Sequence, residues 1–127
     1  MISTLILSAA VAVPPPNGYD PSPILNAIRH VESGGRTDLV GDGGKAIGPY
    51  QIHLEYWRDA VAWDRTLGGT YADCRNPQYA RRVVLAYLSR YTPDWNPQTV
   101  ARVHNGGPMG YRRAATLGYW TKVARAM

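Results

Sequence analysis

Residues 31–52 read VESGGRTDLVGDGGKAIGPYQI, which places a helix end directly before a glycine-rich segment. The preceding apolar residues recur at helical spacing: Ile24, Leu25, Ile28 and Val31. Gly34-Gly35 is expected to end this helix, because glycine adopts the left-handed conformation of a helix C-cap without strain. The glycine density over 36–52 excludes a regular helix, so we expect a short hairpin with its turn at Asp42-Gly43.

Three pairs of a capping residue and a proline predict further helix starts along the chain. They are Ser22-Pro23 for the first helix, Asn76-Pro77 for the strongest helix (to about residue 90) and Asn96-Pro97 for a short helix reaching His104. Other helices are expected over about 53–63, 109–116 and 118–126, with a loop over 64–75. The expected fold is therefore mainly α (α+β), with several helices and one small β-hairpin after the first helix.

The chain has 127 residues, which fits one domain. Residues 1–12 are apolar and small and resemble a secretory signal peptide, although no Lys or Arg precedes the apolar run. The alternative is a buried N-terminal strand or arm. Residues 13–21 are proline-rich and read as a linker, which leaves 22–127 as the folded domain. A signal peptide would make the protein secreted, periplasmic or associated with the cell wall.

The net charge of +5 indicates an anionic partner, which could be nucleic acid, a membrane surface or an acidic polymer. Two arginine doublets, Arg81-Arg82 and Arg112-Arg113, are the only features that favour nucleic acid, and no groove-reading motif accompanies them. One cysteine cannot form an internal disulfide, and the three histidines lack metal-ligand spacing. We therefore expect no nucleic-acid partner, no metal or cofactor, no stable membrane insertion, and a monomer.

Glu32 and Asp42 form a pair of carboxyl groups suited to glycosidic cleavage. Glu32 falls in the last turn of the first helix, where the negative end of the helix dipole disfavours a charged carboxylate. A protonated carboxyl is what a general acid needs. Asp42 is expected at the wetter hairpin turn, where it would stay ionised and could stabilise or trap a positively charged sugar. Each residue alone also has an ordinary structural explanation, as a helix end and a turn former.

Five short motifs stand in one order along the chain. They are E-S-G-G at 32–35, G-P-Y-Q-I at 48–52, Y-W-R-D-A at 56–60, H-N-G-G-P at 104–108 and G-Y-W at 118–120. This ordered set resembles the invertebrate-type lysozyme (destabilase) family over about residues 24–124. It is also similar to the soluble lytic transglycosylases of bacteria. Both belong to the lysozyme-like superfamily.

The resemblance implies a lysozyme-like fold and cleavage of β-1,4 bonds between N-acetylmuramic acid and N-acetylglucosamine in peptidoglycan. It implies that Glu32 is the catalytic acid and Asp42 the second carboxylate. Tyr50 and Gln51 would line the substrate cleft, His104 and Asn105 would form its opposite wall, and Tyr119 would lie near the acid. Those relatives are rich in disulfides, whereas this chain has only Cys74.

Two other functions stay open on the sequence. A lytic transglycosylase would use Glu32 alone, first as acid and then as base, and would release 1,6-anhydro-muramyl products. A non-catalytic glycan-binding module with the same fold would not need Glu32, although Glu32 is one of only two glutamates in the chain.

Overall fold

The computed structural model describes residues 15–16 and 18–127, so the predicted signal segment 1–12 lies outside the described residues. The α-helices are α1 (Ser22–Ser33), α2 (Leu54–Trp63), α3 (Pro77–Tyr91), α4 (Pro97–Gly106) and α5 (Leu117–Ala126). The strands are β1 (Val40–Gly41), β2 (Ala46–Ile47) and β3 (Ile52–His53). Short 3₁₀ helices cover Asp42–Gly44, Arg65–Leu67, Tyr71–Arg75, Gly110–Arg112 and Ala114–Thr116. The expected mainly helical fold with a small sheet after the first helix is confirmed.

Side-chain caps begin α3 and α4 as the sequence predicts. The Asn76 side chain accepts a hydrogen bond from the Tyr79 amide at the start of α3, and the Asn96 side chain accepts one from the Thr99 amide at the start of α4. The prediction for α1 was wrong by one residue, because the helix already includes Ser22, which was expected to be its N-cap. Asp20, rather than Ser22, accepts the hydrogen bond at the N-terminus, from the Ser22 amide at 2.9 Å. A carboxylate two residues earlier reaches that amide, and Ser22 is already helical.

The glycine-rich segment forms a sheet of three strands rather than a two-stranded hairpin. Val40 pairs with Ile47, and Ala46 pairs with His53, so the strand order is β1-β2-β3 and all pairs are antiparallel. The turn between β1 and β2 lies at Asp42–Gly44, as expected. Gly48 has a φ of 78°, and a Cβ there would overlap the Cys74 carbonyl, so glycine is required where the chain turns toward β3.

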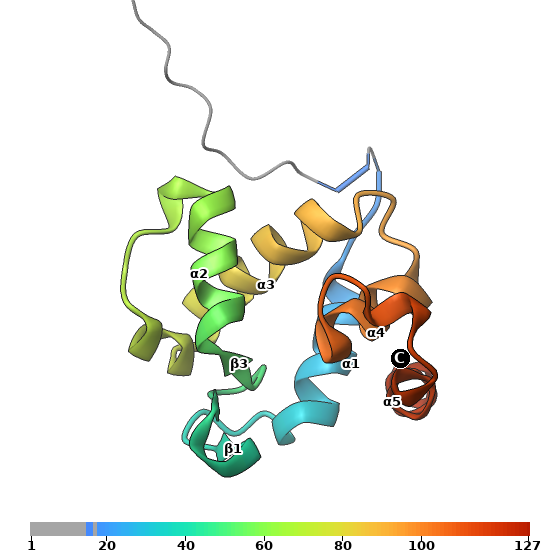
Figure 1. The fold of residues 1–127 in the computed structure, drawn as a ribbon, viewed down its shortest axis with the longest axis horizontal. Helices are drawn as coiled ribbons and strands as arrows, with labels where there is room; N and C mark the ends of the chain where they lie inside the picture. The colour runs from blue at the N-terminus through green and yellow to red at the C-terminus, as the bar shows by residue number, and fades with distance from the viewer. Residues whose placement is uncertain (1–14, 17) are drawn as a thin grey trace, which may run out of the picture.

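The helices form two groups around one core (Figure 1). Helix α2 packs on α3, while α5 packs on both α1 and α4, and the small sheet lies at one end of the molecule beside the ends of α1 and α2. The core contains Ile24, Leu25 and Ile28 of α1, together with the predicted apolar face of α3 and Trp95. Within the range predicted as a linker, the Tyr19 ring lies 6.0 Å from the Trp95 ring.

The segment 64–75 was predicted as a loop, but it contains two 3₁₀ helices around Gly68-Gly69. A reciprocal pair of hydrogen bonds between Thr70 and Asp73 caps the second of them. This segment carries the buried Cys74, which is a free thiol. The segment is therefore held by packing and hydrogen bonds rather than by a disulfide.

Candidate active site

Glu32 lies in the last turn of α1, next to the point where the helix is tied to the sheet. Gly34 adopts a φ of 64° and donates its amide to the His30 carbonyl, which ends the helix as predicted. The neighbouring Ser33 hydroxyl donates to the Pro49 carbonyl at 2.8 Å, sixteen residues along the chain. The E-S-G-G motif therefore fixes the direction in which Glu32 leaves the helix. Its side chain is 19% exposed.

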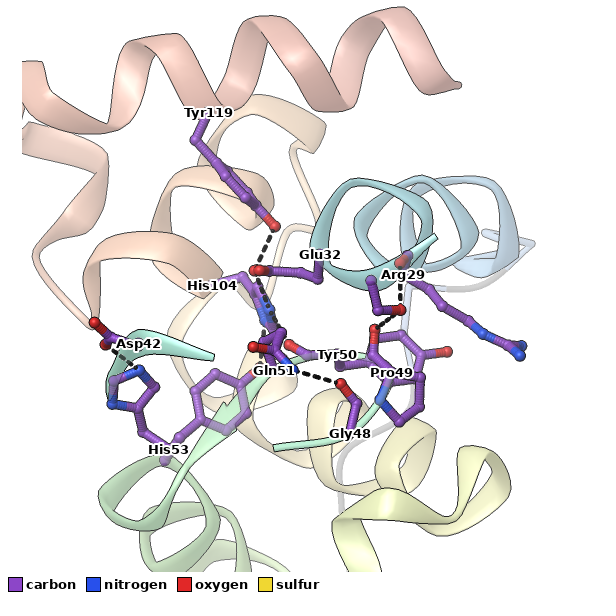
Figure 2. A network of polar contacts seen from close by, with 12 residues as sticks. Arg29, Glu32, Asp42, Gly48, Pro49, Tyr50, Gln51, His53, His104 and Tyr119 are labelled. Carbon is purple, nitrogen blue, oxygen red and sulfur yellow. Dashed lines mark hydrogen bonds and ion pairs between the residues drawn. The ribbon is translucent and has the colours of Figure 1, made fainter. Parts of the chain in front are cut away.

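One oxygen of Glu32 has two neighbours that can donate to it (Figure 2). The Tyr119 hydroxyl of α5 donates to Oε2 at 2.9 Å, and the Nε2 atom of His104 on α4 lies 3.3 Å from the same oxygen. Burial raises the pKa of Tyr119 well above its usual value, and the nearby Glu32 carboxylate raises it further, so the hydroxyl keeps its proton. Oε1 of Glu32 forms no hydrogen bond among the described residues and is free for a substrate.

Glu32 and Asp42 line the same hollow. It has a volume of about 440 Å³, and its wall consists of Glu32, Asp42, Ala46, Gln51, His53, His104 and Asn105. A second hollow of about 330 Å³ shares Gln51, His53, His104 and Asn105 with it and continues past Tyr56, Asp59, Tyr87 and the Gly107-Pro108 turn, with Glu55 at its edge. The two hollows therefore form one cleft between the sheet and helices α2, α3 and α4.

Asp42 occupies a wetter position than Glu32. It lies at the turn between β1 and β2 with a φ of 52°, and its side chain is 65% exposed. Its Oδ2 atom lies 3.0 Å from Nε2 of His53 on β3, and this pair stands to one side of Glu32 in Figure 2. The two carboxyl groups therefore meet one cleft from different environments.

The structure brings most of the other predicted residues to the cleft. The Gln51 amide is held by hydrogen bonds from its Nε2 atom to the Leu39 and Gly48 carbonyls, and Asn105 lines both hollows. His104 lines both hollows together with Asn105, and it also contacts Glu32. The prediction for Tyr50 was wrong: its ring is 2% exposed in the core, and only its carbonyl oxygen reaches the site.

Two residues of the site were not predicted. His53 follows directly after the G-P-Y-Q-I motif, and the sheet register places it beside Asp42. Tyr56 belongs to the Y-W-R-D-A motif, and its hydroxyl lies 2.9 Å from Nδ1 of His104. Both residues lie inside or next to a recognised motif, and this position could have identified them as candidate site residues.

Within residues 15–16 and 18–127, no three His, Cys, Asp or Glu side chains lie close enough to hold a metal ion. Over the same described part of the chain, no helix is both long and apolar enough to cross a membrane.

The chain is similar to several proteins named lysozyme. Residues 22–126 match a family model described as Destabilase. A lysozyme of Magallana gigas is 36% identical over 112 residues, covering 80% of this chain and 77% of that protein. Lysozyme 1 of Crassostrea virginica is also 36% identical, covering 78% of this chain, and the chain spans 55% of that relative's length.

The chain also resembles solved structures of lysozymes. The Tapes japonica lysozyme structure matches with a TM-score of 0.67 at 30% identity, covering 80% of this chain and 85% of that one. The Meretrix lusoria lysozyme, in a complex with Aeromonas hydrophila PliI, matches with a TM-score of 0.68 at 30% identity, covering 81% of this chain and 87% of the matched chain.

Proposed function

Since this chain belongs to the destabilase family of invertebrate-type lysozymes, we propose that it is a muramidase in which Glu32 is the general acid. The lysozyme relatives and the lysozyme structures support a glycosidase of this type. The substrate bond is the β-1,4 linkage between N-acetylmuramic acid and N-acetylglucosamine in peptidoglycan.

The hydrogen bonding of Glu32 carries the proposal. The Tyr119 hydroxyl donates to Oε2 of Glu32, and Nε2 of His104 lies beside the same oxygen. We therefore propose that Oε1 bears the acidic proton and faces the substrate. In the reaction, Oε1 gives this proton to the glycosidic oxygen as the bond to the sugar breaks. The negative charge that then forms on the carboxyl is stabilised by the two donors already in place on Oε2.

Asp42 is proposed as the second carboxylate. It lines the same hollow as Glu32, and its exposure keeps its charged form solvated. The carboxylate is opposite in charge to the sugar cation that develops in the transition state. His53 holds one oxygen of Asp42, so the other oxygen is available to stabilise or trap the sugar. A water molecule then completes hydrolysis, with Glu32 acting as the base.

The cleft fits a glycan chain that extends beyond the cleaved bond. The second hollow adds the stacked rings of Tyr56 and Tyr87 and the polar side chains of Gln51 and Asn105 to the space around Glu32. We propose that this part binds neighbouring sugars of peptidoglycan. The net charge of +5 favours encounter with an anionic cell wall.

A lytic transglycosylase is the second candidate, and the solvent exposure of Asp42 favours it. If the Asp42 carboxylate remains paired with His53 and turned to water, Glu32 would act alone. The proton taken back by Glu32 would then come from the 6-hydroxyl of the sugar, which closes the 1,6-anhydro ring. The two reactions differ by the mass of one water in the product.

We propose that the protein acts as a monomer outside the cytoplasmic membrane, where peptidoglycan lies. The apolar segment 1–12 would be the signal that directs export. Expression of the full chain in a bacterial host followed by N-terminal sequencing of the exported protein tests this. A new N-terminus near Ala12 supports export by a cleaved signal, and an intact Met1 contradicts it.

Clearing of a cell-wall suspension tests the role of Glu32. Glu32→Gln keeps the size of the side chain and removes the acidic proton, so we expect the initial clearing rate to fall by at least about 10²-fold. Asp38→Asn is the control, because Asp38 is an exposed carboxyl outside the cleft that pairs only with Arg36 among the described residues. Full clearing by Glu32→Gln would favour a function without acid catalysis.

A further inference from the structure

We propose that Tyr56 is a positioning residue for the reaction: its hydroxyl fixes the proton of His104 on Nε2, and through it the orientation of the Glu32 carboxyl. This inference rests on the proposed role of Glu32. It concerns three side chains from three different helices, because Tyr56 lies on α2, His104 on α4 and Glu32 on α1.

The contacts of His104 decide which ring nitrogen carries the proton. Its Nε2 atom lies 3.1 Å from the Tyr50 carbonyl oxygen and 3.3 Å from Oε2 of Glu32. A carbonyl oxygen can only accept a hydrogen bond, so Nε2 must be the protonated nitrogen. His104 therefore donates from Nε2 toward the backbone and the Glu32 carboxyl at once.

The other ring nitrogen selects the same tautomer. Nδ1 of His104 lies 2.9 Å from the Tyr56 hydroxyl. Burial raises the pKa of Tyr56 well above its usual value, so this hydroxyl stays protonated and can donate. When the Tyr56 hydroxyl donates to Nδ1, the imidazole is neutral and its single proton stays on Nε2. The hydrogen bonds thus run in one direction, from Tyr56 to His104 to Glu32.

The surroundings hold this chain of hydrogen bonds rigid. The His104 side chain is 2% exposed, and the Tyr56 ring stacks on Tyr87 with 3.6 Å between the ring centres. The rings of Tyr56 and His104 meet edge to face at 5.2 Å. A buried ring with both nitrogens satisfied cannot turn without losing hydrogen bonds. The hydrogen bond from His104 therefore fixes the plane of the Glu32 carboxyl and keeps its Oε1 atom toward the cleft.

Tyr56→Phe tests the proposal, since it removes the hydroxyl and keeps the stacked ring. Without its donor, Nδ1 of His104 can take the proton itself, and Nε2 then no longer donates reliably to Glu32. We expect kcat on soluble peptidoglycan fragments to fall about tenfold, because small errors in the placement of a catalytic group are costly, while KM stays within about twofold. Tyr71→Phe is the matched control. It removes a tyrosine hydroxyl that donates to the Ile52 carbonyl at 2.7 Å and lies 3.3 Å from the Lys45 carbonyl, and Tyr71 does not line either hollow of the cleft.

Nitrogen-15 NMR of the histidine rings gives a readout that a purely structural role would not change. In the unaltered protein, we expect the His104 signals to show a neutral ring with the proton on Nε2 at pH 7. In Tyr56→Phe, we expect a mixture with the Nδ1 tautomer or the charged ring. The His104 signals are assigned by their absence in His104→Gln.

The results separate this inference from the proposed function. It is overturned if the unaltered protein carries the His104 proton on Nδ1, if Tyr56→Phe leaves kcat unchanged, or if kcat falls without any change in the His104 ring signals. It holds if both the tautomer and kcat change in Tyr56→Phe but not in Tyr71→Phe. Glu32→Gln is assayed in parallel, because only retained activity in that variant contradicts the proposed function itself.

Discussion

Tyr119→Phe isolates the contribution of one hydrogen bond to the acid. The change removes the hydroxyl that donates to Oε2 of Glu32 at 2.9 Å and keeps the ring, whose centre lies 6.4 Å from that of His104. A hydrogen bond to a neutral group contributes about 1 kcal/mol, and one to a charged group about 1.5–3 kcal/mol. Glu32 passes from the neutral to the charged form as it donates its proton.

The difference between these two values sets the expected effect. Losing the Tyr119 hydroxyl should destabilise the charged carboxyl by about 0.5–2 kcal/mol more than the neutral one. This corresponds to a decrease in kcat of roughly 2- to 30-fold, with KM nearly unchanged because no substrate contact is removed. The assay is steady-state cleavage of soluble peptidoglycan fragments, together with the free energy of unfolding from urea titration to confirm that the variant is folded.

Tyr111→Phe is the control for this experiment. Tyr111 is 45% exposed, and its hydroxyl forms no hydrogen bond among the described residues. We expect it to have the kcat of the unaltered protein. If a folded Tyr119→Phe protein also keeps the unaltered kcat, the hydrogen bond does not stabilise the developing charge, and the reasoning about Oε2 is refuted.

Three further predictions follow from the charges and the burial of the protein. Asp42→Asn should lower the initial rate of cell-wall clearing by about 10²-fold if Asp42 stabilises the sugar cation, and His53→Gln by less; an unchanged rate in Asp42→Asn would contradict a hydrolytic role. Burial raises the pKa of Cys74 to about 12 and also raises the pKa of Tyr56 and Tyr87. These groups lose protons first in the unfolded chain, so their contribution to the free energy of unfolding should be constant below about pH 8.5 and should fall above it. Equal free energies of unfolding at pH 7 and pH 10 in urea titrations would be inconsistent with this. Clearing should slow as salt rises from about 0.05 to 0.5 M, since the Debye length shrinks to a few Å and screens the net charge of +5; a flat rate over this range would exclude an electrostatic contribution.

The sequence predicted helix ends correctly where a single residue near the end caps the helix. The caps at Asn76 and Asn96 and the helix end at Gly34 each depend on backbone groups within four residues, so the sequence pattern is enough. The N-terminus of α1 was misplaced by one residue, because Ser22 is already helical and its amide donates to the Asp20 carboxylate.

The contacts of the site depend on long-range packing, which spacing alone does not reveal. The helix end and the hairpin turn led to Glu32 and Asp42, and the family resemblance led to Tyr119. The direct contact between His104 and Glu32 joins residues 72 positions apart. Tyr50 was expected in the cleft and is buried instead, while its neighbour Gln51 lines both hollows. The position of His53 beside Asp42 follows from the register of the sheet, which the sequence alone did not predict.

Mass spectrometry of the muropeptides released from purified peptidoglycan tests the muramidase reaction most directly. The unaltered protein should release fragments that end in reducing N-acetylmuramic acid, and Glu32→Gln should release none above background. Asp38→Asn should give the same fragments as the unaltered protein. Release of 1,6-anhydro-muramyl fragments would contradict hydrolysis, and release of any fragment by Glu32→Gln at the unaltered rate would contradict the assignment of Glu32 as the acid.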